Sequence, residues 1–362
     1  MKDAFWQYDP ELGWANRPGA QGIYHRLACD TLVKFNSRGV RGPEYGYERA
    51  PNTYRILFLG DSGMVAHEVE DQYIFVRVVE RELRKKGYAV EIINGATRGY
   101  GTDQLLIWLR REGIKYKPDL VIYRYTVSDR LENITIHRAF RPYGKSYFYV
   151  TEDGSLAQGG VPVPKFPWHE HCTVGKDGTV IRAWPSVFTG AMYIVRDQVL
   201  CRSALGTGML ALASELPSVK ASIKNARLAK VPYHSYDENR INSYEYRLAL
   251  ALTKEMKRVC DENQIRFIVF PGGRSRFGYQ LSKDMGMPNL SMYDAFRDRV
   301  ADGPRWHVRL DSHMNEYGHR VYGEMLTEML IERGVIPLDS LPTLSAKMPA
   351  DPHGGAKPDR LQ

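Results

Sequence analysis

The fold of this chain is decided by residues 54–71, YRILFLGDSGMVAHEVED, where a mostly apolar run ends abruptly at Gly60-Asp61-Ser62. A short apolar run predicts a buried strand of a parallel sheet, because such strands are covered on both faces and do not alternate with polar residues. The small residue, acid and hydroxyl that follow have two interpretations. They form a plain turn into the next helix, or Ser62 is a nucleophile held at the mouth of a sheet.

Strands and helices alternate along the rest of the chain. Further apolar runs predict strands at 89–94, 119–124, 266–270 and 306–310. Apolar residues at helical spacing predict helices over 72–86, 103–112, 241–263, 292–301 and 316–333. This alternation is typical of βαβ units. The fold class that we expect is therefore α/β, a three-layer α/β/α arrangement around a flavodoxin-like parallel sheet of five strands.

Three parts of the chain fall outside this pattern. Residues 1–53 contain many Gly, Pro, Tyr and Arg residues and predict an N-terminal extension of loops and short strands packed on the core. The α/β domain, residues 54–335, is interrupted after its third strand by a long insertion at about 130–240, rich in aromatic residues, Pro and Gly. Residues 336–362 have few large apolar side chains and predict a disordered C-terminal tail.

The composition of 362 residues, 43% hydrophobic and 25% charged, predicts a globular protein that can bury a sizeable core. The net charge is +8, and we interpret the basic patches as solvated helix faces; a weak preference for anionic polymers or membrane surfaces is the alternative. No nucleic-acid motif is present. The four cysteines, at positions 29, 172, 201 and 260, show no CxxC spacing, so neither a disulfide framework nor a zinc site is indicated.

The N-terminal residues MKDAFWQYDPELGW lack the basic segment and apolar run of a signal peptide. No stretch approaches the roughly 18 uncharged apolar residues that a membrane-spanning helix needs. As written, the chain is predicted to be soluble, with no transmembrane segment, and cytoplasmic by default. A periplasmic or envelope-associated protein is the alternative if a leader or anchor has been removed. The pattern indicates no particular oligomeric state.

Polar or Gly-rich residues follow four of the predicted strands at their carboxyl ends, where α/β sheets bind ligands. They are GDS (60–62), NGATRGYGT (94–102), YTVSDR (125–130) and, after the last strand, LDSHMNEYGH (310–319). A serine needs a base to become a good nucleophile, and His313 is the candidate base for Ser62. Asp311, two residues earlier, is placed to hold the imidazole in the right tautomer and to stabilise its cation.

Negative charge that develops on an acyl substrate needs N–H or O–H donors aimed at it. The backbone N–H of Ser62 is one candidate donor if that residue opens a helix. Gly99 is a second, because a glycine backbone can approach a ligand without a side-chain clash. The hydroxyl of Ser128 is a third.

The loops at the same edge also offer contacts for a substrate. Arg98 and Tyr100 flank Gly99 and are candidates for lining the pocket. Arg274, in PGGRSR (271–276) after the fourth strand, is a candidate contact for an anionic or polyhydroxyl substrate. Each feature also has a structural interpretation: DSH is a helix N-cap, GYG is a flexible turn, and the arginines are surface residues.

Taken together, these blocks resemble the SGNH/GDSL hydrolase family of esterases and acyl-transfer enzymes. The similarity covers roughly residues 54–129 and 241–333. LGDS (59–62) matches the nucleophile block, NGATRGYGT the second block with its glycine at Gly99, KPDLVIYRYTVSDR (117–130) the third, and DSHMNEYGHRVYGEML (311–326) the closing block. Residues 9–42 also resemble an N-terminal extension of a subset of bacterial members. Those members often carry a membrane anchor upstream and are commonly thought to act on acylated carbohydrates or envelope polymers.

Two positions depart from the family pattern. The third block usually ends in Asn-Asp, with the Asn side chain donating to the oxyanion, whereas this chain has Ser128-Asp129. A serine hydroxyl is shorter and rotates freely, and the loss of one such donor lowers the rate by about 10²–10³. The closing acid often lies three residues before the histidine, whereas Asp311 lies two residues before His313.

The resemblance implies a serine hydrolase that cleaves carboxylic esters through an acyl-enzyme on Ser62, with no metal or organic cofactor. The expected substrates are O-acyl or O-acetyl esters, including small-molecule and carbohydrate esters, and not nucleic acid. One alternative is an O-acyltransferase that uses the same residues with a sugar hydroxyl as acceptor. Another is a catalytically weak carbohydrate-binding module, for which Ser128 is the only support.

Overall fold

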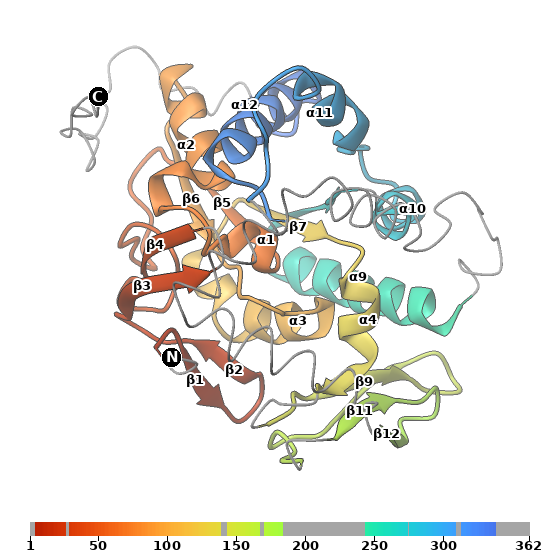
Figure 1. Ribbon diagram of the computed structural model, residues 1–362. Coiled ribbons are helices and arrows are strands. Elements are labelled where there is room, and N and C mark those ends of the chain that lie inside the picture. Colours follow the sequence, from red (N-terminus) through yellow and green to blue (C-terminus); the bar gives the residue numbers. More distant parts are fainter. Residues whose placement is uncertain are drawn as a thin grey trace.

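The computed structural model describes residues 4–26, 29–138, 143–166, 170–183, 243–273, 275–308 and 313–337, and Figure 1 shows their arrangement. At their centre lies a parallel sheet with the strand order β6-β5-β7-β13. Its strands are β5 (Tyr54–Leu59), β6 (Val90–Asn94), β7 (Leu120–Tyr125) and β13 (Arg266–Pro271). These strands lie where the sequence predicts them, to within a residue at each end.

Both faces of this sheet are covered, which explains the apolar runs. The residues of β5 alternate between two cores: Ile56 and Phe58 join one hydrophobic cluster, whereas Leu57 and Leu59 join the other. All four side chains are fully buried. A strand without a solvent face has no reason to alternate between apolar and polar residues. The α/β fold class predicted from the sequence is confirmed.

Helices lie on both sides of the sheet (Figure 1). One face carries α2 (Phe75–Lys85), α11 (Tyr293–Arg299) and α12 (Glu316–Glu332), and the other carries α3 (Thr102–Arg111), α9 (Tyr244–Glu262) and α10 (Arg276–Asp284). The helices α2 and α12 pack closely because Gly323 lies against Val78; a Cβ on Gly323 would come within 2.6 Å of the Val78 Cβ. Two short 3₁₀ turns, η1 (Asp71–Tyr73) and η2 (Gly113–Tyr116), precede α2 and follow α3.

The predicted fifth strand, 306–310, is the main difference between prediction and structure. Residues 309 and 310 lie outside the described residues. Of the rest, His307 forms an isolated antiparallel bridge with Met314 and does not join the parallel sheet. The Val308 N–H donates to the carbonyl of His313 at 2.9 Å. The backbone groups of this segment are therefore used by the loop that follows it.

The N-terminal residues form two antiparallel hairpins. They pair β1 (Trp6–Asp9) with β2 (Gly13–Asn16), and β3 (Gln21–Arg26) with β4 (Cys29–Lys34). Phe5, Val33 and Phe35 are buried in the same cluster as Ile56 of the central sheet. This part of the chain therefore shares a hydrophobic core with the sheet.

Short elements follow β7 along the chain. They are α4 (Asp129–Ile134), β8 (Thr135–His137), β9 (Tyr147–Val150), β10 (Leu156–Gly159), β11 (His171–Val174) and β12 (Val180–Ala183). The strands form two small antiparallel sheets, β10-β9 and β12-β11-β8. The rest of the predicted insertion, 184–242, and the predicted tail after residue 337 lie outside the described residues. Within those residues, no helix is both long and apolar enough to span a membrane.

Candidate active site

A serine and a histidine that are far apart in the sequence meet at the carboxyl edge of the sheet. Ser62 is the first residue of the short helix α1 (Ser62–Val65), which begins just after β5. The side chain of Asp61 caps this helix by accepting the Gly63 N–H at 3.0 Å. The Nε2 of His313 lies 2.9 Å from the Oγ of Ser62, which is a hydrogen-bond distance. This is the geometry that a hydroxyl nucleophile and its base require.

Hydrogen bonds of Asn315, two residues further along the chain, hold the backbone next to His313. The Asn315 N–H donates to the carbonyl of Trp306 at 3.1 Å. The side chain of Asn315 caps α12 by accepting the Gly318 N–H at 3.0 Å, and its amide donates to the carbonyl of Arg305 at 2.6 Å. The imidazole is therefore anchored both to the preceding segment and to the start of a long helix.

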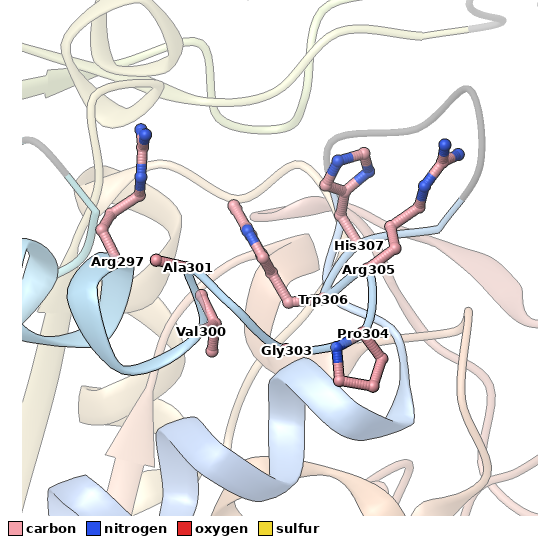
Figure 2. A pocket seen from close by; sticks show the side chains of 8 residues that line it. All are labelled: Arg297, Val300, Ala301, Gly303, Pro304, Arg305, Trp306 and His307. Carbon is pink, nitrogen blue, oxygen red and sulfur yellow. The ribbon is translucent and has the colours of Figure 1, made fainter.

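The segment before His313 also lines a surface pocket of about 500 Å³. Figure 2 shows that the side chains of Arg297, Arg305 and His307 extend to the same side of this pocket. Trp306 packs the edge of its ring against Phe296, with the ring centroids 5.4 Å apart. The pocket includes neither Ser62 nor His313, and its wall is the segment that supports the histidine.

A buried carboxylate that the sequence analysis did not single out faces the other nitrogen of His313. The Nδ1 of His313 lies 3.5 Å from the Oε1 of Glu68, whose side chain is completely buried. The same oxygen accepts a hydrogen bond from the Nη1 of Arg98 at 2.8 Å. In the sequence, Glu68 stands in HEVED (67–71), and no spacing rule separates it from its acidic neighbours.

Of the two residues that flank Gly99, Arg98 reaches the site through Glu68 and Tyr100 does not reach it. Tyr100 is fully buried, its hydroxyl donates to the carbonyl of Trp14 at 2.6 Å, and burial raises its pKa. Its side chain therefore ties the loop to β2 and does not line an open pocket. Two other predicted site residues, Asp311 and Arg274, lie outside the described residues.

Backbone N–H groups near Ser62 are available to a ligand. The loop after β6 is tied to the end of β5 by a hydrogen bond of 3.2 Å from the Thr97 N–H to the carbonyl of Gly60. Gly99 in this loop has a φ of +78°, in the left-handed region that favours glycine. Neither the Ser62 N–H nor the Gly99 N–H donates to an acceptor in the described part of the chain. Two such donors are what a developing oxyanion needs.

The hydroxyl of Ser128 belongs to a polar network behind Ser62. It lies 3.1 Å from Oδ2 of Asp61 and 2.7 Å from Oγ1 of Thr126. Asp61 also accepts a hydrogen bond from Arg124 at 3.2 Å. Asp129 accepts the Thr126 N–H at 2.5 Å, and burial, followed by the charge of Asp61, raises its pKa well above the usual range. The single proton of Ser128 is therefore directed into this network in the present structure.

Two further histidines lie close to His313, but both are buried. His67 packs among the rings of Phe5, Trp6, Tyr24 and Phe35, and burial lowers its pKa well below the usual value. His319 accepts the Phe75 N–H at 3.3 Å, and burial, followed by the charge of Arg124, lowers its pKa to about 3. Both rings are therefore neutral. Among the described residues, no three His, Cys, Asp or Glu side chains cluster in a way that could hold a metal ion.

A second, smaller pocket lies beside Gly99 and has a volume of about 20 Å³. Its walls include Trp14 from the N-terminal hairpin and Glu132, Arg138 and Lys145 from the segment after β7. The carboxylate of Glu132 pairs with the guanidinium of Arg138. Neither Ser62 nor His313 is among the residues that line this pocket.

The sequence matches no protein-family model and no curated protein. The structure is similar to that of TesA, with 9% identity and a TM-score of 0.36 over 77% of this chain and 97% of that chain. It is also similar to the psychrotrophic esterase EstA from Pseudoalteromonas sp., with 11% identity and a TM-score of 0.35 over 78% and 98% of the two chains. A GDSL-like lipase from Bacteroides thetaiotaomicron has 9% identity and a TM-score of 0.34 over 80% and 93%. At these TM-scores the likeness carries no argument, so the function has to be inferred from the site.

Proposed function

We propose that this chain is a serine hydrolase of the SGNH/GDSL type that cleaves carboxylic esters. The observation that carries the proposal is the distance of 2.9 Å between the Ser62 Oγ and the His313 Nε2, which are 251 positions apart in the sequence. The order of the sequence blocks supports the same assignment. A nucleophile and its base must meet at the ligand-binding edge of the sheet, whereas two unrelated polar residues have no reason to do so.

The first half of the proposed reaction forms an acyl-enzyme. As the Oγ of Ser62 attacks the carbonyl carbon of the ester, the Nε2 of His313 takes the hydroxyl proton. A bond forms between Oγ and the carbon, and the carbonyl oxygen becomes an oxyanion. When this intermediate collapses, the bond to the alcohol oxygen breaks, and the alcohol leaves with the proton from His313.

The second half releases the acid. A water molecule gives a proton to the Nε2 of His313 and attacks the acyl carbon, and the collapse of that intermediate returns the proton to the Oγ of Ser62. The net reaction converts one ester and one water into an acid and an alcohol.

A sugar hydroxyl in place of water would make the same residues an O-acyltransferase. Product analysis with and without an added sugar acceptor separates the two reactions.

We assign the oxyanion to the backbone N–H groups of Ser62 and Gly99. Ser128 adds a third donor only after its hydroxyl turns away from Asp61, which it meets at 3.1 Å. Asp311, which lies outside the described residues, is the partner that the sequence predicts for the imidazole of His313. A catalytically weak binding module remains the alternative, because the usual Asn donor is replaced by Ser128.

We infer that the substrates are O-acyl esters, including O-acetyl esters, as the sequence resemblance implies. A carbohydrate hydroxyl is the proposed alcohol partner of the acyl group, which is likewise what the resemblance implies.

The test is the intact mass of the chain after exposure to a fluorophosphonate probe. We expect one adduct on the native chain and on Ser291→Ala, which removes an exposed serine outside the site, and none on Ser62→Ala. If a folded native chain gives no adduct while a control hydrolase is labelled, the proposal is wrong. The binding-module alternative would then be favoured.

A further inference from the structure

The buried carboxylate beside the imidazole indicates how the base is held. We propose that Glu68 is a positioning residue for His313 and that Arg98 holds Glu68 in turn. The inference rests on the proposed function, because the orientation of the imidazole matters for catalysis only if His313 is the base. The sequence blocks assign no such role to Glu68 or Arg98.

Four side chains form a continuous chain of contacts. The Oε1 of Glu68 lies 2.8 Å from the Nη1 of Arg98 and 3.5 Å from the Nδ1 of His313, and the opposite nitrogen of that ring lies 2.9 Å from the Ser62 Oγ. A carboxylate oxygen at Nδ1 favours the tautomer in which Nδ1 carries the proton. The Nε2 is then free to accept the proton of Ser62. The contact of 3.5 Å is longer than a hydrogen bond, and such contacts tighten when substrate is bound.

The burial of Glu68 has an electrostatic cost that its position explains. The side chain is completely buried, and Oε2 has no hydrogen-bond partner within the described residues. A buried carboxylate is unfavourable unless it is paired with positive charge. Arg98 supplies one positive charge, and the imidazolium of His313 supplies a second during the reaction. The carboxylate of Glu68 therefore lies beside the ring on which positive charge develops during the reaction.

The backbone around Glu68 is fixed by a buried arginine. The helix α1 ends at Ala66, whose φ of +45° turns the chain back in the left-handed region. Arg41, which is 0% exposed, donates hydrogen bonds to the carbonyls of Val65, Ala66 and Val69 on both sides of Glu68. These bonds hold the backbone that carries Glu68. Such rigidity is what a positioning residue requires.

Two of the other titratable groups near His313 are excluded from this role. His67 and His319 are neutral, because burial lowers the pKa of each ring. Arg41 and Arg98 lie on the Glu68 side. Asp311 lies outside the described residues and is the other candidate partner of Nδ1, so the experiment compares the two acids directly.

The experiment measures the pKa of His313 and the labelling rate as functions of pH. The imidazole signals of His313 are assigned in NMR spectra by their loss in His313→Asn and then titrated in the native chain, Glu68→Gln, Glu68→Asp and Asp311→Asn. Fluorophosphonate labelling rates are measured on the same chains. Glu91→Gln is the matched control, because it breaks another buried ion pair, with Arg55 at 2.6 Å, at the opposite end of β5.

We expect Glu68→Gln to lower the pKa of His313, and the midpoint of the acid limb of labelling, by about one to two pH units. The plateau labelling rate should fall by about tenfold or more. Glu68→Asp should show smaller decreases in the His313 pKa and in the plateau labelling rate, and Glu91→Gln should change neither value. Arg98→Gln should raise the pKa of His313, since it removes a nearby positive charge. If Glu68 and Arg98 had purely structural roles, Glu68→Gln and Arg98→Gln would not shift the His313 pKa in opposite directions.

If folded Glu68→Gln keeps the native His313 pKa and labelling rate, and Asp311→Asn lowers both, the role belongs to Asp311 and the inference is overturned. If Glu68→Gln does not fold, Glu68→Asp and Arg98→Gln decide, and an unchanged His313 pKa in both overturns it. A native chain that is not labelled, but whose His313 pKa depends on Glu68, would overturn the proposed function and leave the contact intact. The two failures are therefore distinguishable.

Discussion

Replacing Gly99 with alanine tests the oxyanion site, and the structure sets the size of the effect. The φ of Gly99 is +78°, where an L-residue is disfavoured by about 1–2 kcal/mol. The added Cβ meets no obstacle, because its nearest neighbour is the Cζ2 of Trp14 at 3.6 Å, an ordinary contact. We therefore expect Gly99→Ala to fold, with a free energy of unfolding lower by about 1–2 kcal/mol.

The effect on catalysis should be larger than the effect on stability. If alanine relieves its strain by a rotation of the peptide plane that joins it to Arg98, the N–H of residue 99 turns away from the position of the oxyanion. The loss of one such donor lowers kcat by about 10²–10³, or about 2.7–4 kcal/mol in activation free energy. The two effects can therefore be separated by measuring both.

The assays are urea unfolding and hydrolysis of p-nitrophenyl acetate by the native chain, Gly99→Ala and Gly154→Ala. Gly154 is the matched control: its φ is +84°, no atom lies within 4 Å of its Cβ position, and it stands in the turn between β9 and β10. Its substitution should bring similar strain and leave kcat unchanged. If Gly99→Ala also keeps the native kcat, the Gly99 N–H does not stabilise an oxyanion.

Ser128→Ala should lower kcat for ester hydrolysis by less than about tenfold, because the hydroxyl is bonded to Asp61; a loss of a hundredfold would mean that it reaches the oxyanion. The folded pKa of His319 is about 3, against 6.5 for a free histidine, so unfolding takes up a proton between these pH values. The contribution of this group is therefore full above pH 6.5 and falls by about 1.4 kcal/mol per pH unit on acidification. His319→Asn keeps an acceptor for the Phe75 N–H and should flatten the pH dependence of the free energy of urea unfolding between pH 4 and 7; an unchanged slope would refute the assignment.

The central sheet could be predicted because its strands are buried on both faces. The side chains of Leu57 and Phe58 pack into opposite cores, and the apolar run YRILFL is the result of this burial on both faces. The predicted fifth strand fails for a different reason. WHVRL is as apolar as a strand, but His307 and Val308 bond to residues of the His313 loop. An apolar run indicates burial and does not reveal which backbone becomes its partner.

The candidate site could be predicted where it depends on strand ends and not where it depends on side-chain direction. The carboxyl ends of parallel strands converge, so Ser62 could be matched with a histidine after a distant segment. Glu68 could not be found, because its approach depends on a left-handed Ala66, and a non-glycine residue gives no sequence signal for that conformation. Tyr100 was expected in the pocket, yet a loop side chain can equally turn inward, as its bond to Trp14 shows.

The N-terminal residues contain no candidate catalytic group, yet they hold the backbone on both sides of the site. Trp14 donates to the carbonyl of Arg98 at 3.1 Å, and Asn16 donates to the carbonyl of Ala96 at 3.1 Å, so the loop of Gly99 rests on the first hairpin. Arg41 holds the turn that carries Glu68. Donors and positioning carboxylates work only if they are kept within about 0.5 Å of the productive geometry. The described N-terminal residues therefore support the loop of Gly99 and the turn of Glu68, on which the proposed oxyanion site and the proposed base depend.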